Sequence, residues 1–203
     1  MAPYISMTMT PMVLTARLHK RRNPKCKIAF IGPCAAKKLE ASRRTVRSEV
    51  DFVLTFEELR GMFEAKGIDF NNIPDTEAIY EASAPACGFA AGGGVAKAVE
   101  EVIHRIDPTV EVKTVCAEGL RECRQMLRIA RTGKYDGYLL EGMACPGGCI
   151  AGAGTVQLPE KSRQRLEKYK AAAPLSNPMD TAYMEEIKLL HEEYEDWDRV
   201  GRH

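Results

Sequence analysis

The sequence predicts an α/β fold in which helices flank largely parallel strands. Short apolar runs alternate with segments of helical periodicity along much of the 203-residue chain, which is the pattern of strand–helix–strand units. Glycine or proline follows several of these segments, as expected where strands and helices end. In addition, a cysteine motif around Cys34 and another around Cys145 and Cys149 each follow a predicted strand. Open α/β sheets bind ligands at this edge, so we expect both motifs to face one cleft.

The amino-terminal part is predicted to contain, in chain order, helix 11–22, strand 27–31, strand 52–55 and helix 56–66. The first strand is a short apolar run that ends at Gly32-Pro33, a strand followed by a turn. The second helix carries Leu59, Met62 and Phe63 on one face and is closed by Gly67.

The remainder is predicted to contain helix 93–106, strand 110–115, helix 120–131, strand 138–140 and a charged helical tail over 160–203. Helix 93–106 has the clearest apolar stripe, made of Val95, Val99, Val102, Ile103 and Ile106. The tail is interrupted at Pro174 and Pro178. Its apolar stripe, interpreted as a packing face, consists of Met184, Ile187, Leu190, Tyr194 and Trp197.

Composition restricts the location and the partners of the chain. A mass of 22.5 kDa accommodates one large domain or two small lobes. The net charge of +1 gives no reason to expect nucleic acid or a charged membrane surface as a partner. No apolar run approaches the ~20 residues of a membrane helix, and no signal peptide is evident. Seven cysteines in irregular spacing favour a reducing compartment, so we expect a cytoplasmic protein.

The most informative stretch is residues 141–155, Glu-Gly-Met-Ala-Cys-Pro-Gly-Gly-Cys-Ile-Ala-Gly-Ala-Gly-Thr. It contains Cys145 and Cys149 among small residues, which allow the backbone to approach a bulky group closely. Thiolates are the preferred ligands of iron–sulfur clusters. The spacing alone leaves three interpretations open: an iron–sulfur cluster, half of a zinc site, or two buried structural cysteines.

The second motif is Gly-Pro-Cys-Ala-Ala-Lys-Lys-Leu-Glu, residues 32–40. Lys37 and Glu40 follow Cys34 by three and six residues, so a helix or turn that starts here would bring them near the thiol. An ammonium group close to a thiol favours the thiolate. The alternative is an ordinary surface helix start.

Together, the two motifs resemble the second and third signature motifs of the FeFe (iron-only) hydrogenases. The second signature is matched by Pro33, Cys34, Lys37 and Glu40, with Gly32 in place of methionine. The third is matched by Glu141, Met143, Ala144, Cys145, Gly147, Gly148, Cys149, Gly152 and Gly154. The departures from the third are Ala153, Thr155 and Val156. The resemblance covers most of the chain and is weakest after about residue 160.

The resemblance implies a two-lobed catalytic domain and a specific cofactor. This cofactor is the H-cluster, a 4Fe–4S cubane joined through a cysteine to a diiron unit that carries CO, cyanide and a dithiolate bridge. By resemblance, Cys34 and Cys145 ligate the cubane, and Cys149 both ligates it and bridges to the diiron unit. Reversible interconversion of protons and dihydrogen, with ferredoxin as the electron partner, is the implied activity.

The resemblance also implies roles for five residues that are not ligands. Lys37 would donate a hydrogen bond to a cyanide, and Glu40 would pair with Lys37 or help transfer protons. Met143 would line the pocket, and Phe89, beside the glycine triplet 92–94, would form a wall. Gly32 would remove one wall of the pocket.

The family's first signature, which supplies the fourth cubane ligand and a proton-donating cysteine, has no match. We therefore expect residues 1–203 to be an amino-terminally incomplete catalytic domain, inactive alone, that needs the missing part and the H-cluster maturation proteins. Cys87 is a substitute fourth ligand in this view, although a small buried residue is the simpler interpretation. Two alternatives are a hydrogen-sensing relative and a non-catalytic iron–sulfur relative that acts in cluster assembly.

Overall fold

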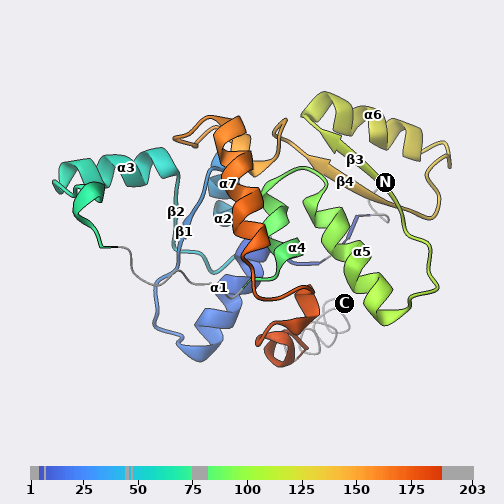
Figure 1. Cartoon of the computed structure of the whole chain (residues 1–203), viewed down its shortest axis with the longest axis horizontal. Helices are drawn as coiled ribbons and strands as arrows, with labels where there is room; N and C mark the ends of the chain where they lie inside the picture. The colour runs from blue at the N-terminus through green and yellow to red at the C-terminus, as the bar shows by residue number, and fades with distance from the viewer. Residues whose placement is uncertain (1–4, 7, 44–45, 47, 75–81, 189–203) are drawn as a thin grey trace.

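The computed structural model describes residues 5–6, 8–43, 46, 48–74 and 82–188 (Figure 1). Its fold is mixed α/β with parallel strand pairs, as predicted, but the strands form two separate sheets of two strands each. β1 (Ala29–Ile31) pairs with β2 (Phe52–Leu54). β3 (Lys113–Glu118) pairs with β4 (Tyr138–Met143). In a parallel pair both carboxyl ends lie at the same edge, so β1 and β4 each deliver the following cysteine motif to such an edge.

The described helices are α1 (Pro11–Arg22), α2 (Ala35–Ser42), α3 (Phe56–Ala65), α4 (Ala84–Cys87), α5 (Gly94–Ile106), α6 (Leu120–Ala130) and α7 (Pro159–Ala171). Short 3₁₀ segments are η2 (Phe70–Asn72), η3 (Gly88–Ala90), η4 (Cys149–Ala151) and η5 (Pro178–Asp180). In Figure 1, α3 projects at one end of the molecule, and α6 lies along the sheet β3–β4 at the other. Between them, α4 packs against both α5 and α7.

The strands placed at 27–31 and 52–55 are slightly shorter in the structure, and two predicted strands differ more in their bounds. The strand placed at 110–115 is β3, three residues later, because Val110 still belongs to the turn after α5 and donates its N–H to the Asp107 carbonyl at 3.3 Å. The strand placed at 138–140 continues to Met143. The polar Glu141 and the small Gly142 ended the apolar run in the sequence, yet Gly142 fits the sheet because a Cβ there would lie 3.2 Å from the Cys123 Sγ of α6.

The apolar core is smaller than the sequence pattern suggested. The buried apolar residues in the described part of the chain are Met12, Val13, Ala16, Leu18, Ala96, Ala98 and Met126. On α5, the alanines are buried, whereas the predicted valine–isoleucine stripe is half-buried and its last member, Ile106, is 70% exposed. The predicted apolar face of α3 is not buried, and its Met62 is 53% exposed. In the tail stripe, Leu190, Tyr194 and Trp197 lie outside the described residues.

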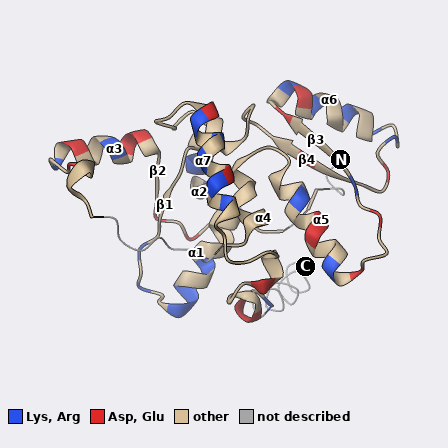
Figure 2. Cartoon of the chain, viewed as in Figure 1, with Lys and Arg blue, Asp and Glu red and all other residues tan. Residues whose placement is uncertain are grey.

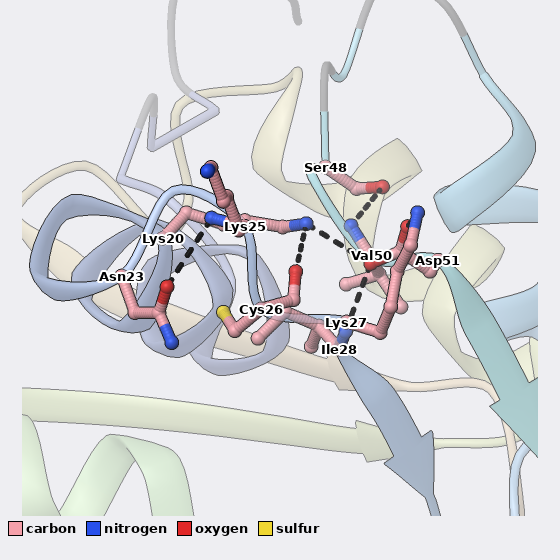
Figure 3. Close-up of polar contacts among 9 residues, drawn as sticks. All are labelled: Lys20, Asn23, Lys25, Cys26, Lys27, Ile28, Ser48, Val50 and Asp51. Carbon is pink, nitrogen blue, oxygen red and sulfur yellow. Dashed lines mark hydrogen bonds and ion pairs between the residues drawn. The ribbon is translucent and has the colours of Figure 1, made fainter.

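Asp51 connects α1 to the start of the sheet β1–β2 (Figure 3). Its carboxylate accepts the Ile28 N–H at 2.8 Å and pairs with the ammonium groups of Lys20 at 3.1 Å and Lys27 at 2.9 Å. Lys20 also donates to the Cys26 carbonyl at 2.5 Å. The backbone hydrogen bond first, and the two lysines next, hold the pKa of Asp51 well below its ordinary value of 3.8. This ionised carboxylate therefore fixes where the strand that leads to Cys34 begins.

Charged side chains of both signs are distributed over the helices (Figure 2). The last turn of α1 is basic, with His19, Lys20, Arg21 and Arg22, where positive charge interacts favourably with the helix dipole. In the part of the chain that the structure describes, no helix has the length and apolar character needed to cross a membrane.

Candidate functional site

Cys34 lies in the turn between β1 and α2. The sheet continues one residue past β1, because Gly32 donates its N–H to the Leu54 carbonyl at 3.0 Å. The chain then turns, and Cys34 is the extended residue that precedes the first turn of α2. The Lys37 N–H donates to the Cys34 carbonyl at 3.3 Å. The helix start considered in the sequence is therefore present, and it places Lys37 one turn from the thiol.

Lys37 and Glu40 form an ion pair on this helix, with 2.5 Å between Nζ and Oε2. The other carboxylate oxygen of Glu40 accepts the hydroxyl of Thr10 at 2.5 Å, which connects the pair to the residue before α1. The side chains of Lys37 and Glu40 are 25% and 20% exposed. Because its carboxylate partner is held on its other side, Lys37 is kept in one place in spite of its flexible stem. Thr10 carries no signal in the sequence that would have marked this role.

Cys145 and Cys149 lie in a tight loop directly after β4. The Gly148 N–H donates to the Cys145 carbonyl at 3.0 Å. Gly147 and Gly148 have φ values of +87° and +79°, a conformation that side-chain-bearing residues rarely adopt. A Cβ on Gly148 would also lie 2.7 Å from the Ala90 carbonyl oxygen. Small residues here thus shape the loop and allow it to pack against the backbone of η3.

The two cysteine motifs contact each other through their backbones. The Gly154 N–H donates to the Pro33 carbonyl at 3.2 Å, and Gly152 lies so close to the same carbonyl that a Cβ would not fit. The segment after Cys149 therefore lies against the turn before Cys34. This contact joins motifs that are more than a hundred residues apart in the chain.

The pKa of the Cys149 thiol is affected by the other predicted site residues. Burial raises the pKa of the Cys149 thiol, and charge on the Cys34 and Cys145 sulfurs raises it further, whereas the Lys37 ammonium lowers it. Three thiols and one ammonium group are therefore close enough to influence one another. The assignment of Cys34, Cys145, Cys149 and Lys37 to one site stays a prediction, which the backbone contact between the two motifs supports.

The three thiols are the type of donor that an iron–sulfur cluster requires. Zinc draws its thiolates to about 2.3 Å from one point, and no three histidine, cysteine or carboxylate side chains in the described residues converge in that way. A cubane is ligated at separate irons, so its cysteines stand further apart, and thiolates are the ligands that such clusters require. The donor set is thus compatible with the iron–sulfur group that the resemblance implies, with Cys34, Cys145 and Cys149 as its ligands.

The other predicted site residues lie on β4, on η3, at the end of α4 and in the turn after β1. Met143 ends β4, on the same face of the sheet as Glu141, and is half-buried. Phe89 lies in η3, next to the Ala90 that packs on Gly148. The Cys87 thiol has its pKa raised by burial, and its charged neighbour is Lys170 of α7. Gly32 faces the ring of Phe30, because a Cβ there would lie 2.8 Å from Cε1. A methionine at this position would displace that ring.

Glu141 has a role that the sequence did not reveal. Its side chain is buried, and its two oxygens accept the N–H groups of Gly93 at 2.9 Å and Ala96 at 2.7 Å. These are unpaired donors at the start of α5. The glycine triplet 92–94 therefore leads into a helix start whose N–H groups are already bound by a carboxylate of the same chain.

The chain is similar to hydrogenases and to iron–sulfur assembly factors. It is 29% identical over 163 residues to the periplasmic Fe hydrogenase large subunit of Nitratidesulfovibrio vulgaris, covering 64% of this chain and 38% of that one. It is 27% identical, over an alignment of 242 positions including gaps, to the cytosolic Fe–S cluster assembly factor narfl of Xenopus tropicalis. This alignment covers 96% of this chain and 50% of that one. The chain thus spans half or less of the length of these relatives.

The fold is similar to that of a solved FeFe-hydrogenase. The apo FeFe-hydrogenase HydA1 variant from Chlamydomonas reinhardtii superposes with a TM-score of 0.65 at 16% identity, over 91% of this chain and 65% of that one. Residues 1–153 match the family described as iron only hydrogenase large subunit, C-terminal domain. Because this match spans three quarters of the chain and includes both cysteine motifs, the protein belongs to this family of iron-only hydrogenase domains.

Proposed function

We propose that this chain holds a 4Fe–4S cluster through Cys34, Cys145 and Cys149 and forms part of an FeFe hydrogenase. The observation that carries the proposal is the contact between the two cysteine motifs, in which the Gly154 N–H donates to the Pro33 carbonyl at 3.2 Å and Gly152 packs on the same carbonyl. In this view the complete enzyme interconverts protons, electrons and dihydrogen at an H-cluster. This cofactor would supply the redox chemistry, and the chain would supply its ligands and surroundings.

The residues around the thiols have distinct tasks in this proposal. Lys37, whose ammonium is held by Glu40 at 2.5 Å, would donate a charge-assisted hydrogen bond to an anionic ligand of the diiron unit. Glu40, which accepts from Thr10 on its other side, would orient Lys37. Half-buried Met143 and Phe89 would exclude water. The proposed partners are ferredoxin, the H-cluster maturation proteins and the rest of the catalytic domain, in the cytoplasm.

A second candidate function is iron–sulfur cluster assembly without hydrogen chemistry. It is favoured by the similar identities of 29% to a hydrogenase and 27% to a cytosolic assembly factor. Lys37 separates the two candidates, because its charge is useful beside an anionic diiron unit and has no evident task around a plain cubane. We therefore place the hydrogenase proposal first.

The first experiment is anaerobic reconstitution with iron and sulfide. The wild-type chain is compared with a Cys145→Ser/Cys149→Ser double variant and with Cys26→Ser, a matched control at the opposite end of β1. About four irons and four sulfides are expected for the wild type and the control, and loss of both is expected for the double variant. A Cys87→Ser variant determines whether Cys87 or an added small thiol is the fourth ligand. Tight zinc binding in place of iron would refute the cluster.

The second experiment distinguishes the two functions. The reconstituted chain is mixed with a synthetic diiron complex, and infrared spectra are recorded for bound CO and cyanide. Retention of these bands by the wild type, together with their loss in Lys37→Ala at unchanged iron and sulfide content, is expected for the hydrogenase site. Equal behaviour of the two chains, with no retained bands, would favour the assembly function.

A further inference from the structure

We propose that Glu118 is the positioning residue of the loop that carries Cys145 and Cys149. This inference rests on the cluster site proposed above, and it concerns a residue outside both cysteine motifs. Glu118 is the last residue of β3, and it stands opposite Met143 in the register of the sheet. Its side chain extends past the end of β4 into the loop, and its Oε2 accepts the Gly147 N–H at 2.7 Å.

The hydrogen bond from Gly147 to Glu118 lies in the middle of the loop, between the two cysteines. Gly147 lies two residues from Cys145 and two from Cys149. Its φ of +87° is a conformation that residues with side chains rarely adopt, so the loop needs a contact that keeps it there. The Gly148 N–H is already taken by the Cys145 carbonyl. A carboxylate that accepts the Gly147 N–H therefore fixes the middle of the loop, and with it the separation of the two thiols.

Glu118 also contacts the segment that packs on the other side of the loop. Its carboxylate lies against Gly92 so closely that a Cβ there would not fit. Two residues before Gly92, the Ala90 carbonyl packs on Gly148. One side chain thus joins β3, the glycine triplet and the cysteine loop. Glu141, two residues before Met143, anchors the same triplet through Gly93, so two carboxylates hold the surroundings of Cys145.

The charge of Glu118 adds an effect beyond geometry. A carboxylate that accepts an N–H forms a stronger hydrogen bond than a neutral acceptor. It also places a negative charge beside the loop that ligates the cluster, and such a charge disfavours addition of an electron to the cluster. A neutral residue of the same shape would preserve the loop and raise the reduction potential.

The test compares Glu118→Gln and Glu118→Ala with Glu111→Gln, a matched change at an exposed residue that precedes β3. In the cluster-free chain, hydrogen exchange of the Gly147 amide is expected to be about ten-fold or more faster in Glu118→Ala, since its acceptor is lost. Glu118→Gln keeps an acceptor oxygen and is expected to stay within about three-fold of the wild type. Glu111→Gln should exchange like the wild type, and circular dichroism verifies the fold of each variant.

The reconstituted chain gives the second measurement. Glu118→Ala is expected to lose its cluster to a chelator faster than the wild type. Glu118→Gln should retain it but show a higher midpoint potential, which a purely structural residue would not change. Equal Gly147 exchange in the wild type and Glu118→Ala, or an unchanged potential in Glu118→Gln, would overturn the inference. A wild type that binds zinc tightly in place of iron would instead refute the proposed function, and the cluster-free exchange would still decide the role of Glu118.

Discussion

Glu141 is expected to stabilise the fold as well as the site, and its removal gives a prediction of defined size. Its buried carboxylate accepts two N–H groups at the start of α5, at 2.9 and 2.7 Å. A hydrogen bond to a charged acceptor contributes about 1.5 kcal/mol, and a negative charge at a helix start adds about 0.3–1 kcal/mol. Glu141→Ala should therefore lower the free energy of unfolding by about 3–4 kcal/mol. Glu141→Gln, which keeps one acceptor oxygen, should lower it by about half as much.

Urea denaturation of the cluster-free chain, followed by circular dichroism, measures this loss. Glu111→Ala is the control, because it removes an exposed carboxylate from the same part of the chain. Hydrogen exchange localises the effect, and the amides of Gly93 and Ala96 should exchange about a hundred-fold faster in Glu141→Ala. If Glu141→Ala stays within about 0.5 kcal/mol of the control, the size expected for a surface change, the assigned role of this carboxylate is wrong.

Two further changes test how the motifs are held. Gly152→Ala places a Cβ against the Pro33 carbonyl and should cost about 1–3 kcal/mol while accelerating cluster loss. Gly61→Ala is the control, because Gly61 lies in α3 with open space around it, and it should raise the free energy of unfolding by about 0.5–1 kcal/mol. Equal urea midpoints for Gly152→Ala and Gly61→Ala would contradict this prediction. Asp51→Asn should lower the urea midpoint at pH 7. The depressed pKa of Asp51 means that its stabilisation is complete well above pH 3.8 and is lost as the pH falls towards the lower folded value, so the deficit of Asp51→Asn should shrink in acid. A deficit independent of pH would refute the ionised role.

The sequence predicted the order of the elements well because most of them follow periodic patterns. Helix 11–22 has the bounds of α1, and helix 93–106 begins one residue before α5. Periodicity did not indicate how much of each apolar face is covered, because burial depends on neighbours that are distant in the chain. On α5, Ala96 and Ala98 are buried whereas Ile106 is exposed, because the helix start lies against the sheet β3–β4 and its far end does not.

The candidate site was predictable where chemistry and local spacing coincide. Cys34, Lys37 and Glu40 are on one turn and the helix that follows it, so their proximity follows from the chain itself. The contact between Pro33 and Gly154 and the reach of Glu118 to Gly147 join segments with no pattern in common. Such contacts depend on the three-dimensional arrangement of segments that are distant in the chain, and a single sequence contains no signal for them.

In the proposed site, cysteine thiols would ligate the cluster, and carboxylates from neighbouring elements hold the segments around them. The thiols lie in loops at the carboxyl ends of two different sheets, where no ladder of strand hydrogen bonds can fix them. The fixing groups are carboxylates from neighbouring elements: Glu40 on Lys37, Glu118 on Gly147 and Glu141 on Gly93. Each of these carboxylates accepts from a lysine ammonium group or a backbone N–H, so each has a specific partner. A site built this way can hold its thiols in place before iron arrives, because the loop geometry depends on protein groups and not on the cluster.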